Sequence, residues 1–220
     1  MNNKPSQITL DFMDDIQTRD SRIIDFLGEK IIVNKNVFPL DSEFSHSSMM
    51  TAQNIPYGLN TVLDIGTGTG VQAIIAAKRG AKKVLATDID DNSLQNAGEN
   101  IAYHGLQNII ELRKSDLWEN IQSGEKLDLI LAQLPFADCD YISPVSHFLF
   151  DPNFRLHDRV LAKAKQHLNS KGKLFISGGE ISNDKLLLDL IKKYGYKIDD
   201  IKEEIVNSIS WKLYILMDNK

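Results

Sequence analysis

Three glycines at alternate positions, Gly66, Gly68 and Gly70, constrain the fold more than any other feature of the sequence. They follow a short apolar run in the segment VLDIGTGTG at 62–70. Glycines so spaced allow sharp turns and let a ligand approach the backbone without hindrance from a Cβ. The helix predicted at 71–79 would direct its free N–H groups toward that ligand. The segment therefore predicts a strand, a ligand-binding loop and a helix.

Acidic residues end the predicted strands next to this loop. Asp64 precedes the first glycine, Asp88 closes the next strand, and Asp116 follows the third. A glycine loop alone could serve NAD, a flavin or another nucleotide. The three acidic positions make the pattern more specific, because carboxylates accept hydrogen bonds from hydroxyl and amino groups.

Strands and helices alternate from residue 61 onward. The hydrophobic pattern predicts strands at 61–65, 83–87, 109–113, 127–132 and 173–177, and helices at 71–79, 90–104, 151–169 and 182–195. A turn is expected at Lys171-Gly172. Two final strands, at 196–203 and 208–217, are separated by only four residues, so they must be antiparallel. We predict an α/β fold: a doubly wound, seven-stranded, mostly parallel (Rossmann-like) sheet with one antiparallel strand.

Residues 1–60 differ in texture and predict a small N-terminal helical and hairpin cap. Ile16, Ile23, Ile24 and Phe26 suggest an amphipathic helix, residues 31–33 and 36–38 a hairpin, and residues 45–55 a second helix. The segment has too few apolar residues to form its own core. We expect it to pack as a cap on a domain formed by residues 61–220.

Composition narrows the classes of protein. The formal net charge is −5, with no long basic run, which weighs against tight binding to a phosphate backbone. Cys139 is the single cysteine, so no intramolecular disulfide or multi-cysteine metal site is possible. The charged first twenty residues lack the apolar region of a signal peptide, and no apolar run is long enough to cross a membrane. A cytoplasmic protein is the simplest expectation.

The segments VLDIGTGTG at 62–70, VLATDID at 84–90, SDLW at 115–118 and DLILAQLPF at 128–136 resemble the class I S-adenosylmethionine-dependent methyltransferases. The sequence is most similar to the HemK/PrmC-type or small-domain branch. VFPLDSEF at 37–44 also resembles the segment that precedes the catalytic domain in that family. The resemblance covers nearly the whole chain after residue 36.

The resemblance implies S-adenosylmethionine as cofactor, with S-adenosylhomocysteine as product, and it implies a role for each matching residue. Asp64 would orient the loop or meet the amino-acid part of the cofactor. Asp88 would accept hydrogen bonds from both ribose hydroxyls, Ile89 would pack on the adenine, and Asp116 would lie beside the adenine amino group, with Leu117 or Trp118 covering the ring. The remaining cofactor-binding positions on this reading are Gly66, Thr67, Gly68, Gly70 and Gln133.

The predicted fourth strand ends in a departure from the family pattern. Members that methylate amide or amino nitrogens carry Asn-Pro-Pro-Tyr or Asn-Pro-Pro-Phe, whereas this chain has Gln133-Leu134-Pro135-Phe136. Gln133, Pro135 and Phe136 are the implied catalytic positions. Glutamine keeps the amide but extends it by one methylene, and a displacement of about 1 Å can cost on the order of a hundredfold in rate. The cofactor assignment does not depend on this position.

The segment at 137–151 is long for a connection between a strand and a helix, which is typical of a substrate lid. Asp138, Asp140, Tyr141 and His147 within it are candidate bases or substrate contacts, and Cys139 is expected to be inert. The five histidines show no metal-ligand spacing. His157 and His167, ten residues apart, are expected to face the surface.

The sequence supports three readings of function. The first is methyl transfer to a nitrogen or oxygen of a small molecule or a protein side chain, with nucleic-acid bases as a sub-case that the negative charge disfavours. The second is a cofactor-binding protein without turnover, because Gln133-Leu134 replaces Asn-Pro. The third is a NAD-type oxidoreductase, although its usual Gly-x-Gly-x-x-Gly spacing is absent.

Overall fold

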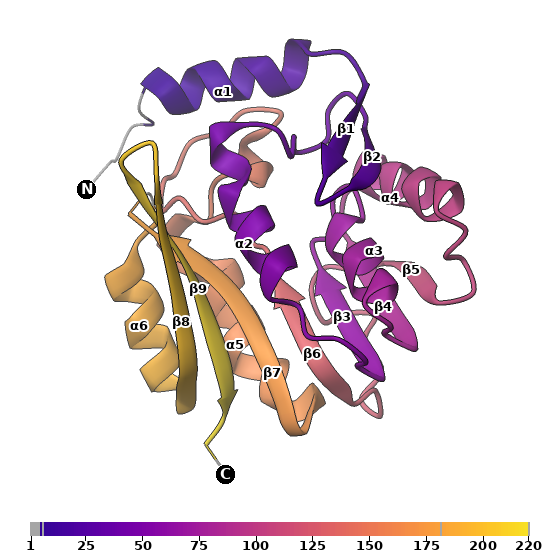
Figure 1. The fold of residues 1–220 in the computed structure, drawn as a ribbon. Helices are drawn as coiled ribbons and strands as arrows, with labels where there is room; N and C mark the ends of the chain where they lie inside the picture. Colours follow the sequence, from indigo (N-terminus) through magenta and orange to yellow (C-terminus); the bar gives the residue numbers. More distant parts are fainter. Residues whose placement is uncertain (1–4, 6, 181, 220) are drawn as a thin grey trace.

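The computed structural model describes residues 5, 7–180 and 182–219, and it contains the predicted seven-stranded sheet (Figure 1). The strands follow the order β5-β4-β3-β6-β7-β9-β8. Five strands, from β5 to β7 in this order, pair in parallel, and β9 runs antiparallel to both of its neighbours, so six strands run in one direction and β9 alone runs in the other. Their bounds are β3 (Thr61–Ile65), β4 (Lys83–Asp88), β5 (Ile110–Lys114), β6 (Leu127–Ala132), β7 (Leu168–Gly179), β8 (Tyr196–Val206) and β9 (Ile209–Asp218).

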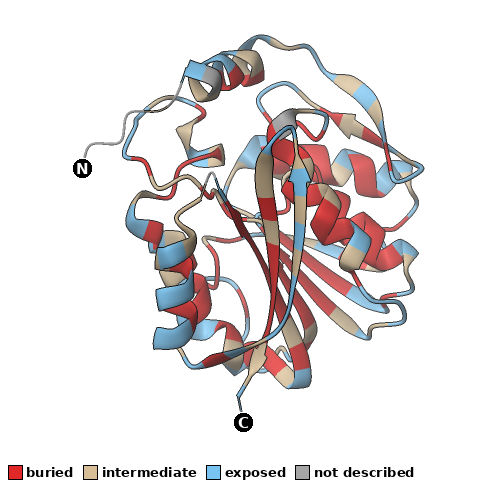
Figure 2. Ribbon diagram, turned by 60° about the vertical axis from the view of Figure 1, so that its left-hand side comes forward, coloured by how far each residue is buried: buried red, intermediate tan, exposed pale blue. Residues whose placement is uncertain are grey.

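Helices cover both faces of this sheet, because its central strands are apolar on both sides (Figure 2). Val62 and Leu129 face a core shared with α3 (Val71–Lys78) and α4 (Asp91–Tyr103). The next residues along these strands, Leu63 and Ile130, face a second core shared with α5 (Arg155–His167) and α6 (Asp184–Lys193). The alternation of side chains along each strand thus produces the three layers of a doubly wound fold.

The N-terminal segment contains α1 (Gln7–Thr18), a hairpin of β1 (Arg22–Phe26) and β2 (Glu29–Val33), and α2 (His46–Asn54). Residues 1–4 and 6 lie outside the described residues. Ile16 belongs to α1 as predicted, but the prediction that Ile23, Ile24 and Phe26 continue a helix was wrong. These residues form β1 because Leu27 and Gly28, both with positive φ, make a two-residue turn that pairs the strand with β2. The hairpin therefore lies earlier than residues 31–38.

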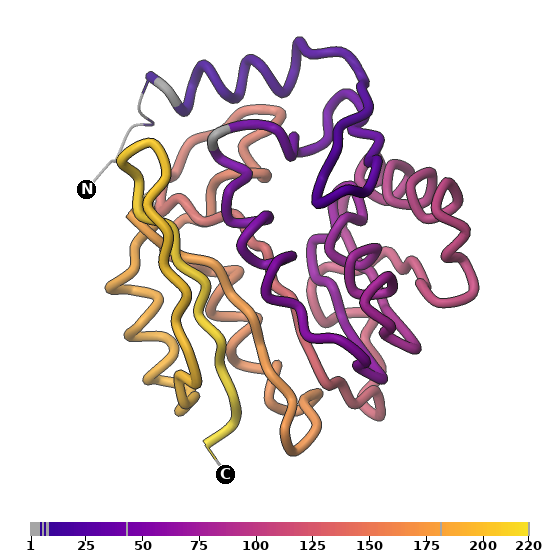
Figure 3. The backbone as a smooth tube through the Cα atoms, viewed as in Figure 1, coloured from indigo at the N-terminus to yellow at the C-terminus, as the bar shows by residue number. Residues whose placement is uncertain are grey.

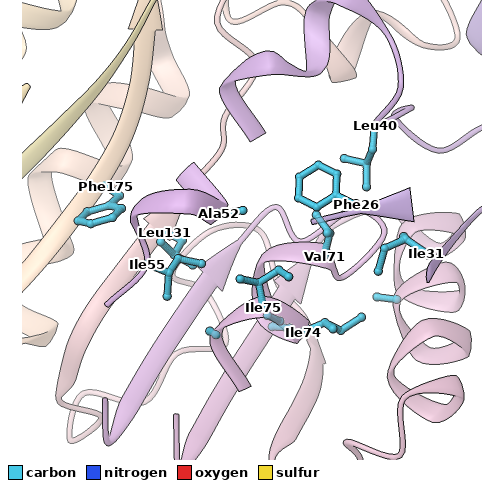
Figure 4. Packing of buried hydrophobic residues seen from close by; sticks show 14 of the residues in the cluster. Phe26, Ile31, Leu40, Ala52, Ile55, Val71, Ile74, Ile75, Leu131 and Phe175 are labelled. Atoms are coloured by element: carbon cyan, nitrogen blue, oxygen red, sulfur yellow. The ribbon is translucent and has the colours of Figure 1, made fainter. Parts of the chain in front are cut away.

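The N-terminal segment shares a core with the sheet. Phe26, Ile31 and Leu40 pack in one cluster with Val71 and Ile74 of α3 (Figure 4). Two asparagines of α4 also bind β2: Asn100 accepts a hydrogen bond of 2.8 Å from the Ile32 N–H, and both Asn96 and Asn100 donate to the Ile32 carbonyl. Buried apolar contacts and polar side chains together hold the segment against the larger domain.

Three details of the C-terminal half differ from the prediction. α5 ends at His167, and Lys171-Gly172 lies within β7, where the register against β6 shifts between Leu127 and Leu129. His157 and His167 are buried. The first lies 2.7 Å from Asp151, and the second stacks on Trp118 at a ring distance of 5.0 Å. Both histidines face the core side of α5 because each has a hydrogen-bonding or stacking partner there.

The last hairpin turns within two residues, Asn207 and Ser208, both at positive φ, so the connection is shorter than the four residues predicted. Among the described residues, no helix is both long enough and apolar enough to cross a membrane.

Candidate cofactor and acceptor site

A cavity of about 420 Å³ lies at the carboxyl ends of the parallel strands. The cavity is lined by residues that directly follow four strands, β3, β4, β5 and β6. The carboxyl ends of parallel strands are where open α/β sheets bind ligands. The N-terminal segment lies above the same end of the sheet (Figure 3). The lining of the cavity includes most of the site residues predicted from the sequence: Gly66, Thr67, Gly68, Asp88, Ile89, Asp116, Leu117, Gln133, Pro135 and Phe136.

The glycine loop turns back over β4. The N–H groups of Gly66 and Thr67 both donate to the Thr87 carbonyl at 2.9 Å. Gly66, Gly68 and Gly70 all have positive φ. Gly70 is the residue before α3 and does not line the cavity. A Cβ at Gly70 would lie 3.1 Å from the Ala97 Cβ, so this glycine allows α3 and α4 to pack closely.

Asp64 lies beneath the loop and is not part of the cavity lining. Its side chain is fully buried, and its Oδ2 accepts a hydrogen bond of 2.6 Å from the Thr67 hydroxyl. Its other oxygen, Oδ1, has no hydrogen-bond partner among the residues described. Burial raises the pKa of Asp64 to about 7; the Thr67 bond opposes this shift, and the nearby charge of Asp88 adds to it. The position suits a residue that orients the loop.

Asp88 connects the loop to the end of β4. Its Oδ2 accepts a hydrogen bond of 2.9 Å from the Gly68 N–H, and its Oδ1 accepts one of 3.0 Å from the Asp90 N–H. Burial raises its pKa above the ordinary value, and these backbone bonds oppose the shift. A carboxylate has about four acceptor positions, so each oxygen of Asp88 can still accept a hydrogen bond from a hydroxyl of a ligand. Ile89 beside it is 58% exposed and borders the cavity.

The turn after β5 brings Asp116 and Leu117 to the cavity. Ser115 holds this turn through a hydrogen bond of 2.9 Å from its hydroxyl to the Leu117 carbonyl. Asp116 forms an ion pair of 3.0 Å with Arg159 of α5, which also lines the cavity. Trp118 is not in the lining, because its indole packs on His167 and donates to the Arg159 carbonyl. Of the two residues expected to cover the adenine, the structure brings only Leu117 to the cavity.

The amide of Gln133 is engaged at both ends. Nε2 donates to the Ser47 carbonyl at 3.2 Å and to the Thr51 hydroxyl, both on α2, while Oε1 accepts a hydrogen bond of 3.1 Å from the Ser177 hydroxyl of β7. Phe136 contacts Trp211 edge-on, at a ring distance of 5.9 Å, and borders the cavity. Gln133 therefore connects the N-terminal segment to the sheet.

The segment 137–151 supplies only part of what was predicted for it. His147 and Phe148 line the cavity, with their rings 4.0 Å apart. Asp138 instead accepts hydrogen bonds from the Asn153 N–H and the Asn183 side chain, and Asp140 and Tyr141 are not in the lining. Cys139 is buried, and this burial raises the pKa of its thiol, which fits an inert side chain.

Several lining residues were missed from the sequence. Phe38, Leu40, Ser47 and Ser48 come from the N-terminal segment, and Leu156 and Arg159 come from α5. The segment at 37–44 carried a signal through its family resemblance. Nothing in the sequence indicated Arg159, because a single charged residue on an amphipathic helix is usually exposed to solvent.

Comparison with known proteins identifies the class. The family model described as ribosomal protein L11 methyltransferase (PrmA) matches residues 47–136. A Methanocaldococcus jannaschii protein named as a protein N5-glutamine methyltransferase is 29% identical over 80% of this chain and 89% of its own length. The crystal structure of a ribosomal protein L11 methylase from Lactobacillus delbrueckii superposes with a TM-score of 0.60, at 26% identity, over 84% of this chain and 82% of that one.

An L11 methyltransferase from Lactobacillus johnsonii is 37% identical over 54% of this chain, but the chain spans only 31% of that relative's length. The relatives are named as methyltransferases, and the fold agrees with that of the solved L11 methylase. The chain is a class I S-adenosylmethionine-dependent methyltransferase with a Rossmann-like fold. The NAD-type oxidoreductase reading gains no support from these relatives.

The residues present fit S-adenosylmethionine. The cavity volume lies within the range of about 300–1,000 Å³ typical of sites for ligands of this size. Asp88 borders the cavity with acceptor positions to spare, and most of the cavity wall as a whole is apolar.

Proposed function

We propose that this methyltransferase transfers a methyl group to a nitrogen or oxygen of a protein side chain or of a small molecule, and we favour the protein side chain. One observation carries the proposal: the glycine loop, Asp88, Asp116 and the segment 133–136 all border a single cavity. The relatives named for glutamine and L11 methylation support a protein acceptor. The similarity to the M. jannaschii protein over most of its length supports placement in the HemK/PrmC-type branch.

The proposed cofactor residues divide by the part of the ligand they would hold. Asp88 would bind the ribose hydroxyls, Ile89 and Leu117 would contact the adenine, and Asp116 would accept from its amino group. Gly66, Thr67, Gly68 and Gly70 would shape the loop beside the methionine part, with Asp64 holding that loop from beneath. When bound, S-adenosylmethionine supplies a methyl group that is already activated by the positive charge on sulfur.

The protein's own part in the reaction is to align the acceptor and exclude water. Leu134, Phe136 and Phe148 present an apolar wall that would desolvate an acceptor. The Gln133 side chain already binds Ser47, Thr51 and Ser177, so we propose that it shapes the wall while Pro135 and Phe136 contact the acceptor. His147 borders the cavity and would accept a proton where the acceptor is a hydroxyl.

A second candidate function, cofactor binding without turnover, is favoured by the same glutamine. Its amide would have to exchange three internal partners for a substrate before it could hold a target nitrogen. Detection of methylated product would exclude this candidate.

We further propose that residues 1–60 form a cap and residues 61–220 the methyltransferase domain. The cap contributes Phe38, Leu40, Ser47 and Ser48 to the cavity, so it would take part in binding rather than only cover the core. The cytoplasmic location remains a prediction from the sequence. The net charge of −5 continues to weigh against a nucleic-acid acceptor.

The first test is calorimetric titration of the full chain with S-adenosylmethionine and S-adenosylhomocysteine. We expect wild-type binding, and a loss of about tenfold or more for Asp88→Ala, since hydrogen bonds to a charged group contribute about 1.5–3 kcal/mol. Asp91→Ala is the matched control, because Asp91 lies on the solvent side of α4 in an exposed ion pair with Lys114. Equal binding by Asp88→Ala and wild type would contradict the assigned site.

The second test is turnover. Radiolabelled S-adenosylmethionine would be incubated with the protein and with glutamine-containing peptides or ribosomal proteins, and mass spectrometry would locate any added methyl group. Cofactor binding without any transfer would favour the second candidate function.

A further inference from the structure

Gln72, the second residue of α3, holds a carbonyl oxygen that no group described in the structure satisfies. The side chain is 3% exposed and lines the cavity just past the glycine loop. Its Nε2 donates a hydrogen bond of 2.8 Å to the Ser48 carbonyl of α2. Its Oε1 is buried and has no hydrogen-bond partner among the described residues.

The orientation of this amide is set by its anchored end. Rotation by half a turn would place Oε1 against the Ser48 carbonyl, so two acceptors would face each other and the bond to Ser48 would be lost. Buried polar atoms in folded proteins nearly always find a partner. The amide is therefore held with its acceptor ready for a donor that a ligand brings.

A second buried polar group between the glycine loop and α3 also lacks a described hydrogen-bond partner. The Thr69 hydroxyl is buried, lines the cavity, and is without a hydrogen-bond partner in the part of the chain that the structure describes. Thr69 and Gln72 flank the start of α3, three residues apart. Two unsatisfied buried groups in one short stretch indicate that this wall binds a polar part of a ligand.

The hydrogen-bonding chemistry of Gln72 Oε1 indicates which part of the ligand it can bind. An amide oxygen can only accept, so the ligand must bring an N–H or O–H group. In the proposed function the adenine amino group is assigned to Asp116 and the ribose hydroxyls to Asp88. The remaining N–H donor of S-adenosylmethionine is the α-ammonium group of its methionine part. That group is charged, and charge-assisted hydrogen bonds are roughly twice as strong as neutral ones.

We propose that Gln72 is a further cofactor-binding residue whose Oε1 accepts a hydrogen bond from the α-ammonium group of the cofactor. The inference rests on the proposed function. Through its other end, the same side chain ties the methionine part to α2, which forms part of the cavity wall. Gln72 thereby recognises the one region of the cofactor that adenosine lacks.

The test is a cycle of two ligands and two proteins, measured by calorimetry. The ligands are S-adenosylhomocysteine and its desamino analogue, which lacks only the α-ammonium group. The proteins are the wild type and Gln72→Met, which keeps the side-chain length but removes the acceptor. We expect Gln72→Met to weaken S-adenosylhomocysteine binding by about tenfold or more. Binding of the desamino analogue is expected to stay within about threefold.

Gln95→Met is the matched control, because Gln95 is exposed on α4, away from the cavity, and should change neither affinity. Equal weakening of both ligands by Gln72→Met would overturn the proposal, since it would show that Gln72 acts only through its bond to Ser48. An unchanged affinity for S-adenosylhomocysteine would overturn it as well.

If the proposed function is wrong, the wild type would bind neither ligand. This result differs from the two above, and it would overturn the proposal for Gln72 together with the proposed function. Should Gln72→Met fail to fold, Gln72→Glu replaces it. A protonated glutamate keeps an acceptor toward the cavity and can donate its O–H to the Ser48 carbonyl in place of Nε2, so the preference for S-adenosylhomocysteine over the desamino analogue should match that of the wild type. A smaller preference would overturn the proposal.

Discussion

The Thr67 hydroxyl donates a hydrogen bond of 2.6 Å to the Asp64 carboxylate, and both side chains are buried at the glycine loop. This bond fixes the first turn of the loop from below. It does not fully compensate the carboxylate for its loss of water, because burial raises the pKa of Asp64 from 3.8 to about 7. The loop is therefore built on an acidic group that is partly protonated near neutral pH.

This shift predicts a pH dependence of stability. Between the ordinary pKa of 3.8 and the folded value of about 7, the folded state binds more protons than the unfolded state, so stability falls as pH rises through that window. Asp64→Asn removes the titration while keeping an acceptor for Thr67. From pH 5 to pH 8 we expect the variant to gain about 2–3 kcal/mol relative to the wild type.

Urea unfolding at several pH values would measure this difference. The raised pKa of Asp88 acts in the same direction in both proteins, so the comparison measures the titration of Asp64 together with its interaction with Asp88. Parallel stability curves for Asp64→Asn and wild type would show that the carboxylate does not titrate as described.

The close packing of α3 on α4 predicts a specific cost at Gly70. Gly70→Ala places a Cβ 3.1 Å from the Ala97 Cβ in a residue with φ of 82°. We expect a loss of about 2–4 kcal/mol, combining about 1–2 for the left-handed backbone with overpacking of the core. Gly28→Ala is the control, since Gly28 has the same φ and nothing within 4 Å. Equal losses in denaturant unfolding would exclude the packing contribution.

Much of the site was predictable because strand ends, a glycine loop and acidic residues are local signals. Asp88 and Asp116 were found by their position after apolar strands, and both border the cavity. Ser48 and Arg159 were not predicted, because their role depends on how α2 and α5 pack against the loop. Nothing local in the sequence distinguishes such residues from ordinary surface residues.

The difference between local signals and contacts made only in the folded chain also explains where the fold prediction was right and where it was wrong. The sheet was predictable from repeated apolar runs of strand length. Ile23, Ile24 and Phe26 were misassigned because a short apolar run fits both a helix and a strand, and the turn at Leu27-Gly28 decides between them. His157 was placed at the surface because its partner, Asp151, lies six residues away and is recognisable only in the folded chain.

The bonds of Gln133 predict that this residue restrains α2. Gln133→Leu would leave the Thr51 and Ser177 hydroxyls without this partner, at a cost of about 1–3 kcal/mol. We expect the backbone amides of α2 to exchange faster with deuterated water, as measured by mass spectrometry. Gln53→Leu, exposed on the same helix, is the control. Identical exchange in α2 for both variants would contradict the restraining role.

The start of α5 depends on a buried acidic residue. Asp151 accepts hydrogen bonds from the Leu156 N–H at 2.9 Å, from the His157 N–H at 3.1 Å, and from the His157 ring at 2.7 Å. Asp151→Ala leaves three buried or partly buried donors without their acceptor, and each such donor costs about 1–3 kcal/mol, so we expect a loss of about 3–5 kcal/mol. Asp158→Ala, on the same helix but in an exposed ion pair with Lys193, should cost far less. Urea unfolding of the two variants separates them. A loss for Asp151→Ala as small as that for Asp158→Ala would mean that α5, and with it Leu156 and Arg159 at the cavity, is positioned by its apolar face alone.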